Sequence, residues 1–289
     1  MKIKIKLSEL LYFSAFFIWL LFNFISQTNL VYKYPEIYRF RIVAMIVSIV
    51  ILLFKLLLER HSSKFLIFFF SAFCLAIIIG ISTHKLFDAL TIISTILFII
   101  SINNVNFRKV LILWTVSIVL LMISIYGLLK FGIIENTLRV QLGGRFRFSQ
   151  GYQYASFGAN FLFHLTLVYL YLRKSKIRLS EILMLGILNY YFYVNTDTKS
   201  AFLLSILALV LVYIFKNKVV SQKILNAIGK ITLTAGILIP IILTYFYNAN
   251  SKFFQILNVS LTGRLSLGHK ALSLYGVHMF GQRIDWELQ

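Results

Sequence analysis

Residues 65–82 read FLIFFFSAFCLAIIIGIS, an unbroken stretch without a charged side chain. A segment of about 20 mainly apolar residues is long enough to cross a bilayer as a helix, in which all backbone hydrogen bonds are internal. The stretch therefore predicts a transmembrane helix. It contains Cys74, the only cysteine of the chain, which cannot form an internal disulfide and is expected to be a small buried apolar side chain.

Similar apolar runs, separated by short charged segments, extend over most of the sequence. Of the 289 residues, 60% are hydrophobic and 13% are charged, whereas soluble domains carry about 25% charged residues. A soluble domain of this size exposes a large surface to water, and it needs more polar residues than this chain has to cover that surface. We predict an all-α integral membrane fold, a polytopic helical bundle with about nine transmembrane helices. The predicted spans are residues 10–30, 40–58, 65–82, 86–102, 110–129, 157–172, 182–196, 201–215 and 231–247.

The formal net charge of +20 is spread over the gaps between apolar runs. A nucleic-acid-binding protein gathers its cations on one face or stripe, so we do not expect nucleic acid as a partner. Cationic loops next to membrane helices mark the cytoplasmic side, which places the N-terminus, with its three lysines, in the cytoplasm. The predicted inner loops are residues 59–64, 103–109, 173–181 and 216–230.

Two predicted outer segments also carry positive charge, against this preference. The transmembrane bundle, residues 1–247, includes the first of them, the outer loop 130–156; the second is an extracytoplasmic loop at 248–289. In the first loop, Arg145 and Arg147 alternate with phenylalanines, and an arginine fork suits phosphate or pyrophosphate oxygens. The alternative is a loop at the interface, with arginines on lipid headgroups and aromatic rings in a belt.

The second outer segment combines an apolar side with basic groups. Leu265, Leu267 and Leu274 favour an amphipathic helix lying on the membrane. Arg264 adds a cation. The histidines His269 and His278 are of a type that serves as a general base near neutral pH, although a histidine in such a loop is also an ordinary polar residue.

The short turn at residues 195–200 contains Asp197 and Lys199. It is either a tight turn in water or a turn folded back into a cavity shared with the two larger loops. The sequence has no Walker-type loop, no dinucleotide fingerprint and no clustered metal ligands. We therefore expect metal-independent chemistry with no cofactor.

Three local patterns in these segments resemble Wzy-type polysaccharide polymerases, of the O-antigen polymerase and ligase family. Residues 147–158, RFSQGYQYASFG, resemble the family's Arg-x-x-x-Gly-aromatic segment, although the asparagine common after the glycine-aromatic pair has no clear counterpart. Residues 196–200, TDTKS, are similar to its Thr-Gly-Ser-Arg turn, with Lys199 in place of arginine. Residues 262–281 resemble the start of the large outer loop in capsule polymerases of Gram-positive bacteria.

The resemblance implies a glycosyltransferase of the bacterial plasma membrane that acts in capsule or exopolysaccharide biosynthesis. It would polymerise oligosaccharide repeat units, held on undecaprenyl pyrophosphate, by inverting glycosyl transfer on the outer face. The pathway's flippase and chain-length regulator proteins would be partners. Pyrophosphate and glycan would be bound by Arg145, Arg147, Lys199 and Arg264, and the general base would be His278, His269 or Asp197.

Other interpretations remain open at this point. A ligase of the same family would transfer finished glycan to another acceptor. A flippase or transporter would hold lipid-linked sugar at the bilayer midplane between internal repeats, for which the sequence gives no sign. Members of the family continue through the large loop into further helices, so the resemblance implies a C-terminally truncated member, and an inactive remnant is the last alternative.

Overall fold

The computed structural model describes residues 6–59, 61–83, 86–141, 145–215, 222–261, 263–278 and 282. The chain divides into two compact units, residues 1–77 with 85–218, and residues 78–84 with 219–289. Each unit is described by itself.

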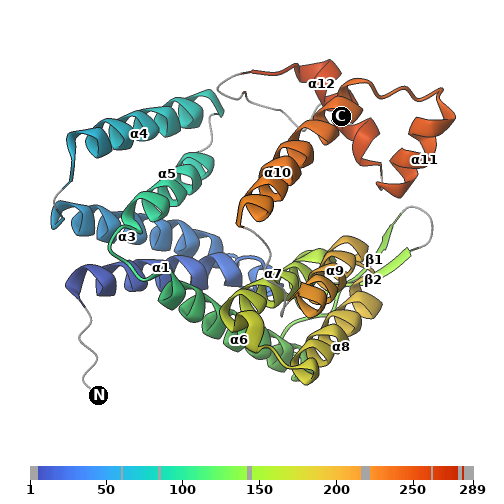
Figure 1. Cartoon of the computed structure of the whole chain (residues 1–289), viewed down its shortest axis with the longest axis horizontal. Helices are drawn as coiled ribbons and strands as arrows, with labels where there is room; N and C mark the ends of the chain where they lie inside the picture. The colour runs from blue at the N-terminus through green and yellow to red at the C-terminus, as the bar shows by residue number, and fades with distance from the viewer. Residues whose placement is uncertain are drawn as a thin grey trace. The chain divides into compact units, whose positions relative to one another are not determined.

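The first unit contains most of the helices and a single hairpin of strands (Figure 1). Its elements in chain order are α1 (Leu7–Ile25), α2 (Leu30–Lys33), α3 (Ile37–Leu57), α4 (Ser63–Thr83), α5 (Leu86–Ser101), α6 (Phe107–Lys130), β1 (Leu138–Gln141), β2 (Arg145–Phe148), α7 (Ala155–Arg173), the 3-10 helix η1 (Lys174–Lys176), α8 (Leu179–Thr196) and α9 (Lys199–Phe215). The last residues of α4 are assigned to the second unit, which also contains α10 (Gln222–Tyr245), α11 (Lys252–Ser260) and α12 (Arg264–Tyr275).

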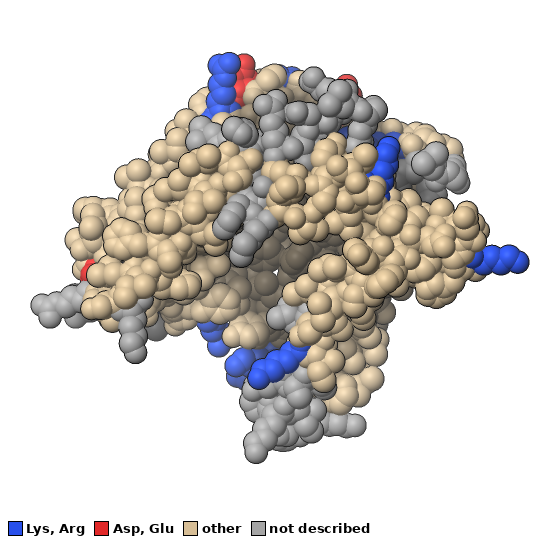
Figure 2. All heavy atoms as spheres, turned by 90° about the horizontal axis from the view of Figure 1, so that it is seen from above, with Lys and Arg blue, Asp and Glu red and all other residues tan. Residues whose placement is uncertain are grey.

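Among the residues that the structure describes, five helices suit a bilayer crossing by length and composition: α1, α3, α4, α6 and α7. Three shorter apolar helical segments occur in α5, α9 and α10. On the face of the molecule shown in Figure 2, lysine and arginine side chains form separate spots on a surface that is otherwise largely uncharged. The protein is thus an all-α membrane protein. A helix occupies each of the nine predicted ranges, but a ninefold crossing remains a prediction.

The end of the first predicted span is wrong, because α1 ends at Ile25 and not at residue 30. Polar side chains after Ile25 bond to the last turn of the helix: Ser26 Oγ donates to Asn23 O at 2.9 Å, and Thr28 Oγ1 donates to Ile25 O at 2.7 Å. Such side chains compete with the continuing helix for its backbone groups. The chain therefore turns here, and a short helix α2 follows.

Three apolar clusters hold the first unit together. Tyr12, Leu52 and Leu97 join α1, α3 and α5. A second cluster, built around Phe24 and Ile118, joins α1 to α6 and α7 and includes a residue of the loop after the hairpin. A third cluster joins α7, α8 and α9.

A buried ion pair lies at the N-terminal end of α1 and the C-terminal end of α3. Lys55 is 0% exposed; its Nζ lies 2.9 Å from Oε1 of Glu59 and donates to Ser101 O at 2.7 Å. Ser8 Oγ donates to the same carboxylate. Burial acts to raise the pKa of Glu59, but the hydrogen bonds from Ser8 and Lys55 outweigh it and lower the pKa.

The predicted burial of Cys74 is wrong, because the thiol is exposed on α4. Only 6% of the apolar window in this helix is buried inside the protein. A helix that is apolar on all sides and still largely uncovered suits contact with lipid. Hydropathy identified a long apolar helix here correctly, but it does not tell a protein-facing side chain from a lipid-facing one.

Candidate functional site

The strands β1 and β2 form an antiparallel hairpin with opposite chemistry on its two faces. Its register pairs Arg139 with Arg147. The neighbouring pairs, Leu138 with Phe148 and Val140 with Phe146, point to the other face, since successive strand residues alternate. All four of these apolar side chains are exposed. The first predicted outer loop therefore contains an amphipathic hairpin.

Arg147 ties this hairpin to the turn between α8 and α9. Its Nε donates to Thr196 O at 2.7 Å, and its Nη2 donates to Thr198 Oγ1 at 2.9 Å. Thr196 is the last residue of α8. The carbonyl groups in the last turn of a helix have no backbone N–H partner within that helix. A cation at this position also interacts favourably with the helix dipole. The turn is thus folded against the hairpin of the first loop. A cavity that this turn shares with both larger loops stays a prediction.

Asp197 and Lys199 flank Thr198, one of the two residues that Arg147 binds. Asp197 ends α8 in the left-handed conformation, with φ 45°, and its backbone N–H donates to Tyr193 O at 2.8 Å. Its side chain is half-buried, whereas that of Lys199, at the start of α9, is exposed. One turn therefore brings a carboxylate and a lysine next to an anchored arginine.

The loop after the hairpin is fixed to the link between α1 and α2. The side chain of Asn29 donates to Glu135 O at 2.8 Å and to Ser149 Oγ at 3.2 Å, and its backbone N–H donates to Gly151 O at 2.8 Å. The backbone N–H of Gln153 donates to Gln27 O at 2.9 Å. These bonds join segments that are more than 100 residues apart in sequence and hold the base of the hairpin in place.

Gly151 has a conformation and a position that other residues do not tolerate. Its φ is +83°, and a Cβ there would lie 2.9 Å from side-chain carbons of Ile125 and Ile134. The next residue, Tyr152, is 2% exposed, and burial raises the pKa of its phenol, which stays protonated at neutral pH. The Gly-aromatic pair at residues 151–152 thus has a structural reason, as the point where the loop enters the helical core.

The structure adds residues that the sequence interpretation did not place in the site. The guanidinium of Arg139 lies 4.6 Å from the centre of the Tyr154 ring, a cation–π geometry. On α3, Arg41 donates through Nε to Asn23 Oδ1 at 2.8 Å. An arginine inside a predicted span is a functional candidate by itself, and this signal was available in the sequence.

An apolar cavity of about 540 Å³ lies between α6, α7 and α8. Its wall includes Val119, Leu165 and Leu188, and the loop after the hairpin contributes Gln150 and Tyr152. It also includes Phe192, whose carbonyl accepts the hydroxyl hydrogen of Thr196 at 2.7 Å. The cavity thus extends to within one helical turn of the residue that binds Arg147.

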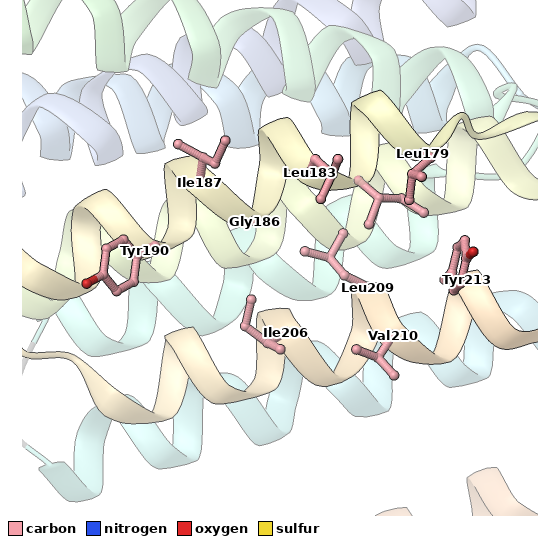
Figure 3. Close-up of a pocket in the computed structure, with 10 residues that line it drawn as sticks. Leu179, Leu183, Gly186, Ile187, Tyr190, Ile206, Leu209, Val210 and Tyr213 are labelled. Atoms are coloured by element: carbon pink, nitrogen blue, oxygen red, sulfur yellow. The ribbon is translucent and has the colours of Figure 1, made fainter.

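A second apolar cavity, of about 410 Å³, lies between α8 and α9 (Figure 3). Its lining comes from these two helices, with Leu183 and Ile187 across from Ile206 and Leu209. It contains no residue of the hairpin or of the loop that follows it. We therefore assign the first cavity, and not this one, to the candidate site.

The other predicted site residues lie in the second unit. Arg264 is exposed at the start of α12, and His278 is exposed beyond its end. His269 is half-buried on α12, with Nδ1 3.1 Å from Thr244 O. Since a carbonyl oxygen only accepts, Nδ1 carries the proton, which leaves Nε2 of the neutral ring as an acceptor. His269 therefore has the tautomer of a general base.

Some predicted positions fall outside what the structure describes. Arg145 begins β2, opposite Gln141 in the register, but its side chain is not among the described ones. Residues 262 and 279–281 of the third family-like pattern also lie outside the described residues.

Comparison of the chain with protein-family models, with curated proteins and with solved structures finds no match. The chemistry of the site therefore rests on its own geometry: an anchored arginine, a neighbouring lysine and carboxylate, and an apolar cavity beneath them.

Proposed function

We propose that this protein polymerises oligosaccharide repeat units carried on undecaprenyl pyrophosphate, as Wzy-type polymerases do, on the outer face of a bacterial plasma membrane. One observation carries the proposal. The turn between α8 and α9 contains Asp197 and Lys199 and accepts hydrogen bonds from Arg147 of β2. It adjoins an apolar cavity of about 540 Å³ within the same unit. A lipid-linked pyrophosphate needs both features, cations for its head and apolar surface for its tail.

The reaction breaks the bond between the anomeric carbon of the growing glycan and an oxygen of the pyrophosphate. A hydroxyl of the incoming repeat unit attacks from the opposite face, forms the new glycosidic bond and loses its proton to a base. The pyrophosphate leaves with the bonding electrons, so negative charge grows on it. Arg147 and Lys199, together with Arg145 of the same unit, are proposed to stabilise that charge.

For the base, the candidates are Asp197 in the first unit and His269 or His278 in the second. Asp197 follows directly after Thr196, whose carbonyl binds Arg147. The left-handed backbone conformation of Asp197 fixes its position there. His269 has an acceptor nitrogen, because its other ring nitrogen is hydrogen-bonded to Thr244. Either group is chemically able to take the proton of a sugar hydroxyl.

The cavity would take the isoprene units next to the pyrophosphate. Burial of apolar surface stabilises a bound ligand by about 25 cal/mol for each Å² removed from water, but a prenyl tail already lies in lipid. The cavity would therefore contribute mainly orientation. It would hold the pyrophosphate end of the tail beside Gln150, which lines the cavity.

The test is a reconstituted assay with the whole protein in nanodiscs. The substrate is the lipid-linked repeat unit isolated from the organism's own membranes, and gel electrophoresis resolves product lengths. We expect a ladder of products, and Arg147→Ala should lower the rate by about 10²–10³, the usual loss of one charge-stabilising donor. Arg108→Ala is the matched control, since Arg108 is exposed at the start of α6 and should leave the rate unchanged.

Other outcomes decide between the alternatives. A single transfer to an acceptor without a lipid carrier would indicate a ligase. Movement of unreacted substrate across proteoliposomes would indicate a transporter. Unchanged substrate with the wild-type protein, under conditions in which a known polymerase is active, would contradict the proposal.

A further inference from the structure

The amphipathic helix α11 has an exposed apolar side. Phe253, Ile256 and Val259 recur at every third position, and they are 63%, 70% and 78% exposed. These three side chains form what we call the α11 apolar face. In a protein surrounded by water, such a face would be turned inward.

The opposite side of α11 packs on its own unit. Phe254 contacts the ring of Tyr247, with centroids 5.8 Å apart. Asn258 bonds to Ser266 of α12 twice: its Nδ2 donates to Ser266 Oγ at 3.2 Å, and its Oδ1 accepts from the Ser266 backbone N–H at 3.1 Å. The helix therefore directs an asparagine inward and three large apolar residues outward. Its orientation is fixed by these contacts, so the exposure of the apolar face is not the result of a free helix.

The neighbouring helix repeats the arrangement. On α12, Leu267 and Leu274 are 68% and 57% exposed, while Leu265 is 3% exposed. Gly268 lies against Thr244 of α10: a Cβ at this glycine would be 2.8 Å from Thr244 Cγ2. α12 is thus held close to the end of α10 (Figure 1). Two successive helices, α11 and α12, leave apolar side chains exposed.

Charge and chain length identify the medium that covers these residues. Residues 246–278 contain Lys252, Arg264 and Lys270 and no aspartate or glutamate. All three cations are exposed. Residues 246–251 alone connect α11 to the end of α10, whose segment Gly229–Tyr245 is an apolar helix. A cationic, acid-free pair of helices so close to the end of an apolar helix matches an anionic bilayer surface in charge and reach.

We infer that α11 and α12 form a membrane-surface anchor, with the α11 apolar face immersed among the lipid headgroups and upper acyl chains of an anionic leaflet. Lys252 and Lys270 then contact lipid phosphate. This contact concerns attachment of the second unit to the bilayer, and it does not depend on the proposed glycosyl transfer.

The test measures the depth of single positions in the whole protein. Because Cys74 is the only cysteine, a Cys74→Ser background allows one label at a time. An environment-sensitive fluorophore is attached at Phe253→Cys or Ile256→Cys, in nanodiscs of phosphatidylcholine with phosphatidylglycerol. The matched control is Gln255→Cys, which at about 100° per residue points about 160° away from Phe253 and about 100° away from Ile256. Quenching is measured with doxyl-labelled lipid and with aqueous iodide.

We expect labels at residues 253 and 256 to be quenched by the doxyl lipid, and the label at residue 255 to be quenched more by iodide. Substitution of Lys252→Gln or Lys270→Gln should shift the equilibrium away from the lipid-quenched state by about fivefold for each lysine. Strong iodide quenching at residues 253 and 256 would overturn the inference, since the face would then lie in water. Shielding from both quenchers would also overturn it, because a protein partner or a second copy would then cover the face.

Discussion

Arg139 and Arg147 lie directly opposite each other in the hairpin register, yet their guanidinium groups have different partners. Arg139 lies over the ring of Tyr154, and Arg147 donates to Thr196 and Thr198. Like charges directly opposite on a sheet are destabilising, so this pairing needs compensation. The ring of Tyr154 and the Thr196 carbonyl supply compensation for the two arginines.

The bond from Arg147 to Thr198 can be removed with little change in shape by Thr198→Val. Arg147 keeps its bond to the Thr196 carbonyl but loses one partner, and a hydrogen bond of a charged group contributes about 1.5–3 kcal/mol. We expect the polymerisation rate to fall about tenfold or more. Ser200→Ala, on the exposed side of the same turn, should have no effect. Equal rates for the two variants would mean that the position of Arg147 is not important for the reaction.

Gly151→Ala should destabilise the first unit. A side chain at φ +83° is strained, and its Cβ meets Ile125 and Ile134 at 2.9 Å, for a combined cost of about 2–4 kcal/mol. The destabilisation is measured as a decrease in the midpoint of thermal unfolding in detergent, which is monitored by size-exclusion chromatography. Gly127→Ala is the control, since nothing lies within 4 Å of a Cβ there and alanine favours the helix. The midpoint of that variant should stay the same or rise.

Stability should also depend on Glu59 as the pH falls. The pKa of Glu59 is lower in the folded protein than the value of about 4.3 in an unfolded chain. Its contribution is therefore complete above that unfolded value and is lost as the pH falls through the folded-state pKa. The midpoint of thermal unfolding, measured from neutral to acidic pH, should decrease in that range, and less so in Glu59→Gln.

At neutral pH, Glu59→Gln leaves Lys55 buried without its counter-charge, which costs about 3–5 kcal/mol. Lys55→Met together with Glu59→Gln should recover much of this loss. Glu36→Gln, at an exposed carboxylate before α3, should change neither the midpoint nor its pH dependence. If Glu59→Gln and Glu36→Gln behave alike, the buried pair does not stabilise the fold.

The two histidines of the second unit should differ in their importance. His269 has a fixed tautomer with an acceptor at Nε2, whereas His278 is exposed beyond α12. If the base is a histidine, His269→Ala should lower the polymerisation rate by about 10²–10⁴ and His278→Ala should not. If both variants keep full activity while Asp197→Asn loses it, the carboxylate is the base.

The helices in the nine predicted ranges were predictable from sequence, because each range is an apolar run bounded by polar or charged residues. The short helices α2 and α11 were not predicted. The hairpin was not recognised, although residues 138–140 and 146–148 alternate apolar and basic side chains, which is the period of a strand. The run is short and lies in a segment with several glycines, so it was interpreted as a loop.

The candidate site was predictable only as a set of residue types. The sequence singles out Arg147, Asp197 and Lys199 by residue type, but the partner of Arg147 is 49 residues away in the sequence. No local pattern reports such a contact. Arg41 was not considered for a different reason. It lies inside residues 40–58, which the sequence analysis treats only as an apolar transmembrane span.

The bond between Asn29 and Ser149 also has a consequence for biogenesis. The two residues are 120 positions apart, so Asn29 leaves the ribosome long before its partner exists. At about 5–20 residues per second the delay is roughly ten seconds. During that time the first helix hairpin is already inserted, and its polar turn has only water or an insertase to bond to. The contact between the α1–α2 link and the β-hairpin is therefore a late event, completed only after the segment that follows α6 has been synthesised.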